Sequence, residues 1–245
     1  MAKLFYIKRL FHFDIRYTPD DWFDDLLSSK VPGKYKIKKS FETIEARQTR
    51  NSTIYSLIAM KNKDKIVEGI FSLYEMYGRA DYIGEPVSQI EHMSQAAKLA
   101  IDEGFDDEVV LAAFFHDIGH ICVMANPENN MGGFGMKSHE KIGADYLREK
   151  GFPERIAQLV ENHVHAKRYL TFIFPEYYDK LSEASKKTLE FQGGRMNQVE
   201  ATNFERDPLF EISIRMRHWD DQAKEMNIPL IDLTKLKSKV KVALK

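Results

Sequence analysis

The stretch that decides the fold reads Leu111-Ala112-Ala113-Phe114-Phe115-His116-Asp117-Ile118-Gly119-His120. Its first half is a run of apolar, helix-forming residues. Its second half places two metal-ligand side chains, His116 and Asp117, directly after that run. Because the carboxylate of such a pair can bridge two ions, the stretch predicts a helix that ends at a metal site.

Further imidazole and carboxylate side chains stand at long intervals on either side of this pair, at His92, His139, His163 and Asp220. Taken singly, each histidine is more often a core or surface residue than a ligand. Seven of the eight histidines, however, fall in segments that we predict as helical. Four imidazoles and two carboxylates from separate helices suit a site for divalent transition metals, and imidazole favours iron, zinc or copper.

The pattern His…His-Asp…Asp resembles the HD-domain superfamily, whose members are mostly phosphohydrolases built on a bundle of helices. Four more motifs narrow the resemblance: Tyr82-Ile83-Gly84-Glu85-Pro86, His163-Val164-His165-Ala166-Lys167, Gln192-Gly193-Gly194 and Arg217-His218-Trp219-Asp220. With them, residues 66–230 resemble the HD-domain mixed-valent di-iron oxygenases of organophosphonate breakdown, which are relatives of the inositol oxygenases.

This resemblance implies a centre of two iron ions, Fe(II)/Fe(III), with O2 as co-substrate. It implies that one iron is held by His92, His116, Asp117 and Asp220. It implies that the other is held by Asp117, His139 and His163, with Asp117 bridging and with space for substrate.

The same resemblance implies a set of phosphonate contacts, formed by His120, Lys167, Ser185 and Arg217. The spacing agrees, because Lys167 follows the proposed ligand His163 by four residues and therefore lies on the same helix face. The planar fork of Arg217 suits phosphonate oxygens. By resemblance, Tyr82 fills the open iron position before substrate arrives, and Glu85 meets an amine or ammonium group of the substrate.

The implied reaction is cleavage of the carbon–phosphorus bond of a 1-hydroxyphosphonate with O2, giving phosphate and a carboxylic acid. Candidate substrates are 2-amino-1-hydroxyethylphosphonate, its N-methylated forms and hydroxymethylphosphonate. One alternative is a metal-dependent phosphohydrolase of the same superfamily, acting on a phosphate ester or nucleotide. Another is a metal-binding interaction or sensing protein. The loop of Tyr82 and Glu85, with the pair His163 and Lys167, favours the oxygenase.

The composition argues against other kinds of partner. The 245 residues carry 36 basic and 37 acidic side chains and a net charge of -1, so nothing in the balance attracts nucleic acid or an anionic membrane. No apolar run approaches the roughly 20 residues of a membrane span. The single cysteine, Cys122, predicts a buried side chain in a reducing compartment, so we expect a cytoplasmic protein. The basic start at Lys3, Lys8 and Arg9 leaves organellar targeting open, and the oligomeric state is left open too.

We expect an all-α HD-domain helical bundle over residues 63–245, preceded by a small extension of unknown role at residues 1–62. Alternating stretches at 4–7 and 35–38 predict short strands, which would make the extension α+β. In the bundle, we expect helices over 66–77, 87–103 and 107–115, and helices that begin near Pro153 and Ser182. We expect a loop at 126–135, and we expect Ser138 to cap the helix of His139.

Overall fold

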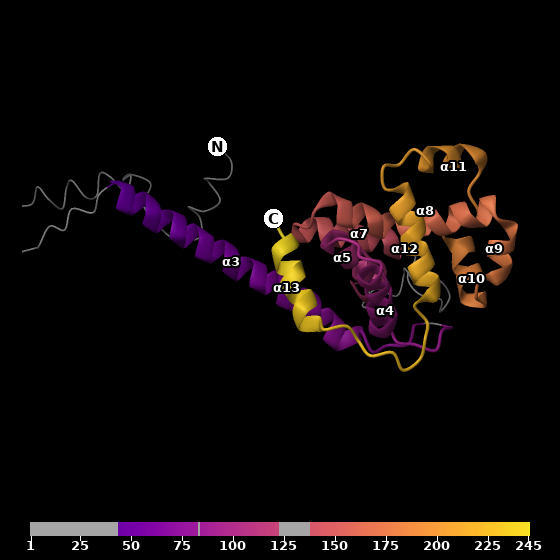
Figure 1. The fold of residues 1–245 in the computed structure, drawn as a ribbon, viewed down its shortest axis with the longest axis horizontal. Coiled ribbons are helices and arrows are strands. Elements are labelled where there is room, and N and C mark those ends of the chain that lie inside the picture. The colour runs from indigo at the N-terminus through magenta and orange to yellow at the C-terminus, as the bar shows by residue number, and fades with distance from the viewer. Residues whose placement is uncertain (1–43, 83, 123–137) are drawn as a thin grey trace, which may run out of the picture. The chain divides into compact units, whose positions relative to one another are not determined.

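Helix α5 (Asp107–Phe115) is the centre of the bundle, and its bounds are those that the sequence predicts. Every side chain from Val109 to Phe115 is at most 1% exposed. A helix that is apolar all round must be covered on all sides. The helices that contact it include α4 (Gln89–Asp102), α8 (Glu154–Ile173), α12 (Phe210–Gln222) and α13 (Leu233–Ala243). Figure 1 shows α5 among its neighbours.

The computed structural model describes residues 44–82, 84–122 and 138–245, and for residues 44–59 only the helical backbone. Every regular element in these ranges is a helix, which confirms the all-α bundle. The remaining ones are α3 (Ile44–Tyr77), α6 (Ile118–Cys122), α7 (His139–Lys150), α9 (Pro175–Lys180), α10 (Glu183–Phe191) and α11 (Gln198–Phe204). None of the described helices is long and apolar enough to cross a membrane. The strands predicted at 4–7 and 35–38 and the loop at 126–135 lie outside the described residues.

Helix α3 begins well before the predicted start at Ile66 and runs through the border that we expect between residues 62 and 63. That border therefore stays a prediction. The C-terminal part of α3 joins the core, where Tyr74 is 2% exposed and its ring centroid lies 4.8 Å from that of Phe114. Aromatic pairs at this separation attract each other beyond the area they bury.

The caps explain where several helices begin. The helix α4 starts two residues later than predicted because Ser88 is its N-cap: the Ser88 hydroxyl accepts from the amide of Glu91, and the Glu91 carboxylate accepts from the amide of Ser88. The predicted starts at Pro153 and Ser182 are confirmed as the N-caps of α8 and α10.

The expectation for Ser138 is wrong. This residue stands at the N-cap of α7 in the left-handed region, with φ 57° and ψ 31°, and its side chain makes no capping hydrogen bond. A capping hydroxyl reaches the first free amides of the helix from an extended backbone, such as that of Ser182 with φ -62° and ψ 157°. Cys122 also differs from expectation, because it is half-buried rather than buried.

Helices α6 and α7 approach so closely at Gly119 that no larger residue fits there. A Cβ atom on Gly119 would lie 1.9 Å from the carbonyl oxygen of His139 and 3.0 Å from the amide of Gly143. Real Cβ atoms do not come within 3.0 Å of such neighbours. This contact brings the first residue of α7, His139, against the end of α5 and Asp117.

Candidate metal centre

The pair His116 and Asp117 lies at the junction of α5 and α6. His116 is the C-cap of α5 and is fully buried, and Asp117 follows it at 2% exposure. Because α5 is packed on all sides, these two side chains are held in the middle of the bundle. Burial lowers the pKa of His116 to about 4, which favours the neutral imidazole that a metal requires.

Imidazoles surround Asp117 in two groups, one at each carboxylate oxygen. The oxygen Oδ2 lies 3.6 Å from Nε2 of His92 and 3.5 Å from Nε2 of His116. The oxygen Oδ1 lies 3.2 Å from Nε2 of His139 and 3.5 Å from Nε2 of His163. Asp220 joins the first group, since its Oδ1 lies 3.4 Å from Nε2 of His92. The structure thus brings together all six residues that the sequence predicts as metal ligands.

His120 also faces this cluster. Its Nε2 lies 3.9 Å from Oδ1 of Asp117, and its ring stacks on that of His139 with centroids 4.0 Å apart. Ligand atoms of Asp117, His120 and His139 lie within 4.8 Å of one another, as do those of His92, His116 and Asp117. His120 is therefore near enough to the second group to act as a ligand or to contact something bound there.

Main-chain carbonyls orient the imidazoles. Nδ1 of His92 donates to the carbonyl of Ala223 at 2.8 Å, and Nδ1 of His116 donates to that of Ala113 at 2.8 Å. In the second group, Nδ1 of His163 donates to the carbonyl of Val160 at 2.6 Å. A carbonyl can only accept, so each Nδ1 carries the proton and each Nε2 presents its lone pair inward. This is the usual arrangement of histidines that bind metals.

These facing lone pairs fit a cation. Nε2 of His92 lies 3.0 Å from Nε2 of His116, and two lone pairs at that distance repel each other. Two nitrogens that bind one metal ion at about 2.1 Å and at a right angle are themselves about 3 Å apart. The oxygen Oδ2 of Asp117 is buried without a hydrogen-bond partner among the described residues. An orphaned carboxylate oxygen beside inward lone pairs is what a metal ion would satisfy.

The charge of Asp117 is kept by its neighbours. Burial alone would raise the pKa of this carboxyl, but the nearby imidazoles, His116 first and then His139 and His163, lower it well below its usual value. The second acid, Asp220, is held likewise: burial opposes its charge, and Arg217 and His92 lower its pKa well below the usual range. Two ionised, buried carboxylates therefore face the same space as the imidazoles.

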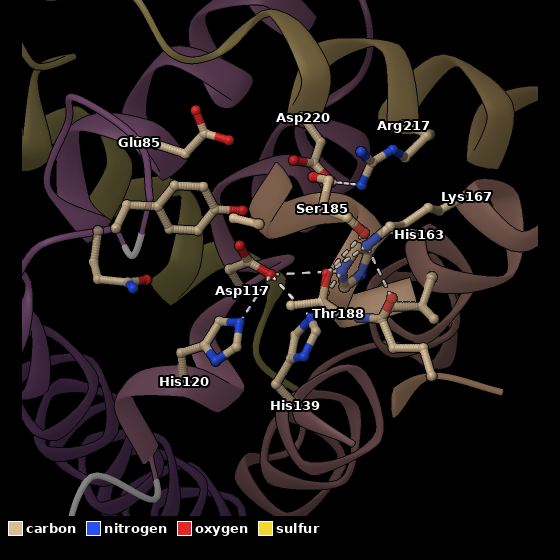
Figure 2. Close-up of a pocket in the computed structure, with 15 residues that line it drawn as sticks. Glu85, Asp117, His120, His139, His163, Lys167, Ser185, Thr188, Arg217 and Asp220 are labelled. Carbon is tan, nitrogen blue, oxygen red and sulfur yellow. Dashed lines mark hydrogen bonds and ion pairs between the residues drawn. The ribbon is translucent and has the colours of Figure 1, made fainter. Parts of the chain in front are cut away.

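A pocket opens from the second group of imidazoles and is lined with groups that suit an anion (Figure 2). Lys167 of α8 is 3% exposed, and its Nζ donates to Oγ1 of Thr188 at 2.7 Å and to Oε1 of Gln192 at 3.0 Å. Burial and, next, the charge of Arg217 lower the pKa of Lys167 to about 7. Ser185, at the start of α10, also lines this pocket. An anion bound here would restore the charge of Lys167.

Arg217 lines the pocket too, but its guanidinium is bound to the protein's own groups. It donates from Nη1 to Oδ2 of Asp220 at 2.5 Å, from Nη2 to Asp221, and from Nε to the hydroxyl of Tyr177 at 2.8 Å. These bonds fix the orientation of Asp220. A contact between Arg217 and a bound phosphonate stays a prediction.

Tyr82 and Glu85 stand in the loop between α3 and α4. The Tyr82 ring stacks on that of His92, with centroids 4.0 Å apart and an interplanar angle of 13°. Burial, followed by the charges of Asp117 and Asp220, raises the pKa of Tyr82 well above its usual value. Between Tyr82 and Glu85, Gly84 has φ +80°, and a Cβ on Gly84 would lie 2.8 Å from Cβ of Ala184 on α10. The loop is thereby packed on the helix that carries Ser185.

Sequence reasoning gave no role to several pocket residues. Thr188 and Gln192 hold the ammonium group of Lys167, and Gln89 of α4 lines the same pocket. A signal for two of them was present, because Thr188 and Gln192 follow Ser185 by three and seven residues, the spacing of one helix face. Tyr177 and Lys224, which bond to Arg217 and Glu85, have no such signal.

Comparisons with known proteins agree with the geometry. The HD domain family matches residues 89–190 of this chain. An uncharacterized protein of Acanthamoeba polyphaga mimivirus is 45% identical over 78% of this chain and 86% of its own length. The 1-hydroxy-2-(trimethylamino)ethylphosphonate dioxygenase (glycine-betaine-forming) of Leisingera caerulea is 37% identical over 71% of this chain and 88% of its own length. The hydroxymethylphosphonate dioxygenase of Gimesia maris is 34% identical over 75% of this chain and 90% of its own length.

Proposed function

The chain belongs to the HD-domain family, together with the two phosphonate dioxygenases, and from that premise we propose that it cleaves the carbon–phosphorus bond of a 1-hydroxyphosphonate with O2. The products would be phosphate and a carboxylic acid. The reaction balances without a reductant, because one O2 accepts the four electrons that leave the carbon and phosphorus, and both oxygen atoms end in the products. The substrates to consider are hydroxymethylphosphonate, 2-amino-1-hydroxyethylphosphonate and its N-methylated forms.

The observation that carries the proposal is the division of the imidazoles between the two oxygens of Asp117. We propose that one iron is held by His92, His116, Asp117 and Asp220, and the other by Asp117, His139 and His163. When bound, an Fe(II)/Fe(III) pair would supply the activation of O2 and the polarisation of the substrate hydroxyl. The first group includes a second carboxylate, and the second group opens into the pocket.

Chain residues would position the substrate in that pocket. The ammonium group of Lys167 would bind a phosphonate oxygen, and Thr188 and Gln192 keep that group in place. His120 and Ser185 would complete the anion site, and Arg217 would hold Asp220 in orientation. Tyr82 lies over His92 and would yield its place as the substrate enters. A buried cation beside the leaving phosphoryl group would stabilise the charge that develops there.

The test is anaerobic reconstitution with iron, followed by addition of O2 and each candidate hydroxyphosphonate, with O2 consumption and phosphate release measured together. We expect one phosphate for each O2 consumed. His163→Gln should abolish both signals, whereas His218→Gln, the same substitution outside the pocket, should change neither. Phosphate release from a phosphate ester or nucleotide, without O2 uptake, would assign the chain to the phosphohydrolases. Bound metal with neither reaction would favour the interaction or sensing protein.

A further inference from the structure

The pocket has an anionic residue at the end away from Lys167. Three carboxylates line the described part of the pocket: Glu85, Asp117 and Asp220. Asp117 lies among the imidazoles, and Asp220 accepts from Arg217. Glu85 is thus the one of the three that stands apart from the metal centre, and in Figure 2 it lies across the view from Lys167. A cation on a substrate whose phosphonate met Lys167 would have to be neutralised by Glu85.

Glu85, however, already holds a cation from this chain. Nζ of Lys224 donates to Oε1 of Glu85 at 2.7 Å, and the two side chains are 18% and 10% exposed, respectively. Both charges are therefore largely withdrawn from water. Removing one partner of such a pair leaves the other charge buried and unpaired, which is costly.

The main chain fixes the place of Lys224. The preceding residue, Ala223, accepts from Nδ1 of His92 through its carbonyl. The following residue, Glu225, exchanges two hydrogen bonds with the side chain of Gln95, at 2.9 and 3.0 Å. Lys224 therefore stands on a segment that is bound to α4 on both sides, and its pairing with Glu85 follows from that position.

A cationic substrate would have to displace Lys224 from Glu85. The exchange replaces one cation with another, so the carboxylate gains nothing, and the displaced ammonium stays close to the new charge. A trimethylammonium group donates no hydrogen bond and could not replace the bond at 2.7 Å. An uncharged substituent leaves the pair intact. Like charges and broken pairs are the usual means by which a site rejects a close analogue.

We propose that Lys224 neutralises Glu85 at the end of the pocket away from Lys167. It would thereby restrict this chain to 1-hydroxyphosphonates that carry no positive charge on the substituent of the hydroxyl-bearing carbon. The inference rests on the proposed function and sharpens its substrate class. The two dioxygenases that resemble this chain differ in that respect: the substrate in the name of one carries a trimethylammonium group, and the substrate in the name of the other carries none. Because of Lys224, we expect the substrate of this chain to lack a cationic group, as hydroxymethylphosphonate does.

The test compares two ligands of nearly equal size that differ in charge, 2-amino-1-hydroxyethylphosphonate and 1-hydroxypropylphosphonate. Their binding to the iron-loaded full chain is measured by titration calorimetry without O2, so that no turnover intervenes. We expect the wild-type protein to bind the uncharged ligand at least about tenfold more tightly. In Lys224→Met, which frees Glu85, we expect this ratio to fall at least about tenfold. Lys224→Arg should keep the wild-type ratio, and Lys235→Met, at an exposed lysine, should also keep it.

The results that would overturn the inference are distinct from those that would overturn the proposed function. Binding of both ligands with equal affinity, or tighter binding of the amine by the wild-type protein, would refute the selectivity and leave the proposed function standing. A ratio that is the same in Lys224→Met as in the wild-type protein would likewise remove Lys224 as its cause. The proposed function is tested separately: absence of O2 consumption and phosphate release with every candidate hydroxyphosphonate, hydroxymethylphosphonate included, would refute the function itself. If Lys224→Met does not fold, preference for the amine in Lys224→Arg would count against the inference.

Discussion

The substitution Gly119→Ala tests whether the approach of α6 to α7 positions the metal centre. The new methyl group would start 1.9 Å from the carbonyl oxygen of His139, and ordinary contact begins at 3.4 Å, so the start of α7 must retreat by about 1.5 Å. Nε2 of His139 now lies 3.2 Å from Oδ1 of Asp117, and a retreat of that size would take it out of reach of a shared ion. Overpacking of this kind costs about 1–3 kcal/mol of stability.

We expect the variant to lose at least one metal ion per chain and to unfold at a lower temperature than the wild-type protein. Since a misplacement of about 1 Å can cost roughly 100-fold in rate, phosphate release should fall by at least that factor. The measurements are iron content after reconstitution, thermal unfolding, and phosphate release from the best substrate. Gly69→Ala is the matched control: among the described residues, no atom outside its own stretch of helix lies within 4 Å of a Cβ placed there, and alanine favours a helix over glycine by about 0.5–1 kcal/mol. If Gly119→Ala kept two metal ions and the wild-type rate, the reasoning from this contact would be refuted.

Three further predictions address the ligands and the charges. Asp117→Asn should lower metal content at both positions, because one carboxylate faces both groups of imidazoles; elemental analysis that still found two iron ions per chain would contradict the bridging role. Chelation of the metal should lower the unfolding temperature, by an amount that corresponds to about 2.7 kcal/mol if the metal was present at 100 times its Kd. An unfolding temperature unchanged by chelation would mean that no metal ion is bound between the Nε2 atoms of His92 and His116. In the metal-free protein, burial lowers the pKa of Lys167 to about 7 from its usual 10.5. The unfolded chain therefore binds more protons than the folded chain between these pH values, so the free energy of unfolding should rise with pH across that window. In Lys167→Met this rise should disappear, and an equal rise in both proteins, measured by denaturant titration, would exclude Lys167 as its source.

The centre of the fold was predictable because local features decide it. The run before His116 is apolar on every face, which confines α5 to the interior, and Pro153 and Ser182 mark the starts of α8 and α10. That the six proposed ligands lie together was predictable from the family pattern, since each stands at a recognisable place in its own motif. Residues 1–43 and 123–137 lie outside the described structure, so the extension stays a prediction.

What the sequence did not reveal depends on packing between distant segments. The bond of Arg217 to Tyr177 requires α9 to lie beside α12, and the pair of Glu85 and Lys224 joins residues 139 apart in the chain. Ser138 misled because its residue type suits an N-cap, whereas its backbone is left-handed. Residue type alone does not report the backbone angles that make a cap work.

Part of the support of the proposed ligands comes from the helices that carry them. Two of the orienting carbonyls, at Ala113 and Val160, stand three residues before the histidines they orient, so the supporting bond is internal to one helical turn. This hydrogen bond forms wherever the helix forms, and it does not depend on the side chain of the residue whose carbonyl accepts it. A designed helical bundle could therefore orient two of the six proposed ligands, His116 and His163, by histidine placement alone, without hydrogen-bonding partners elsewhere in the chain.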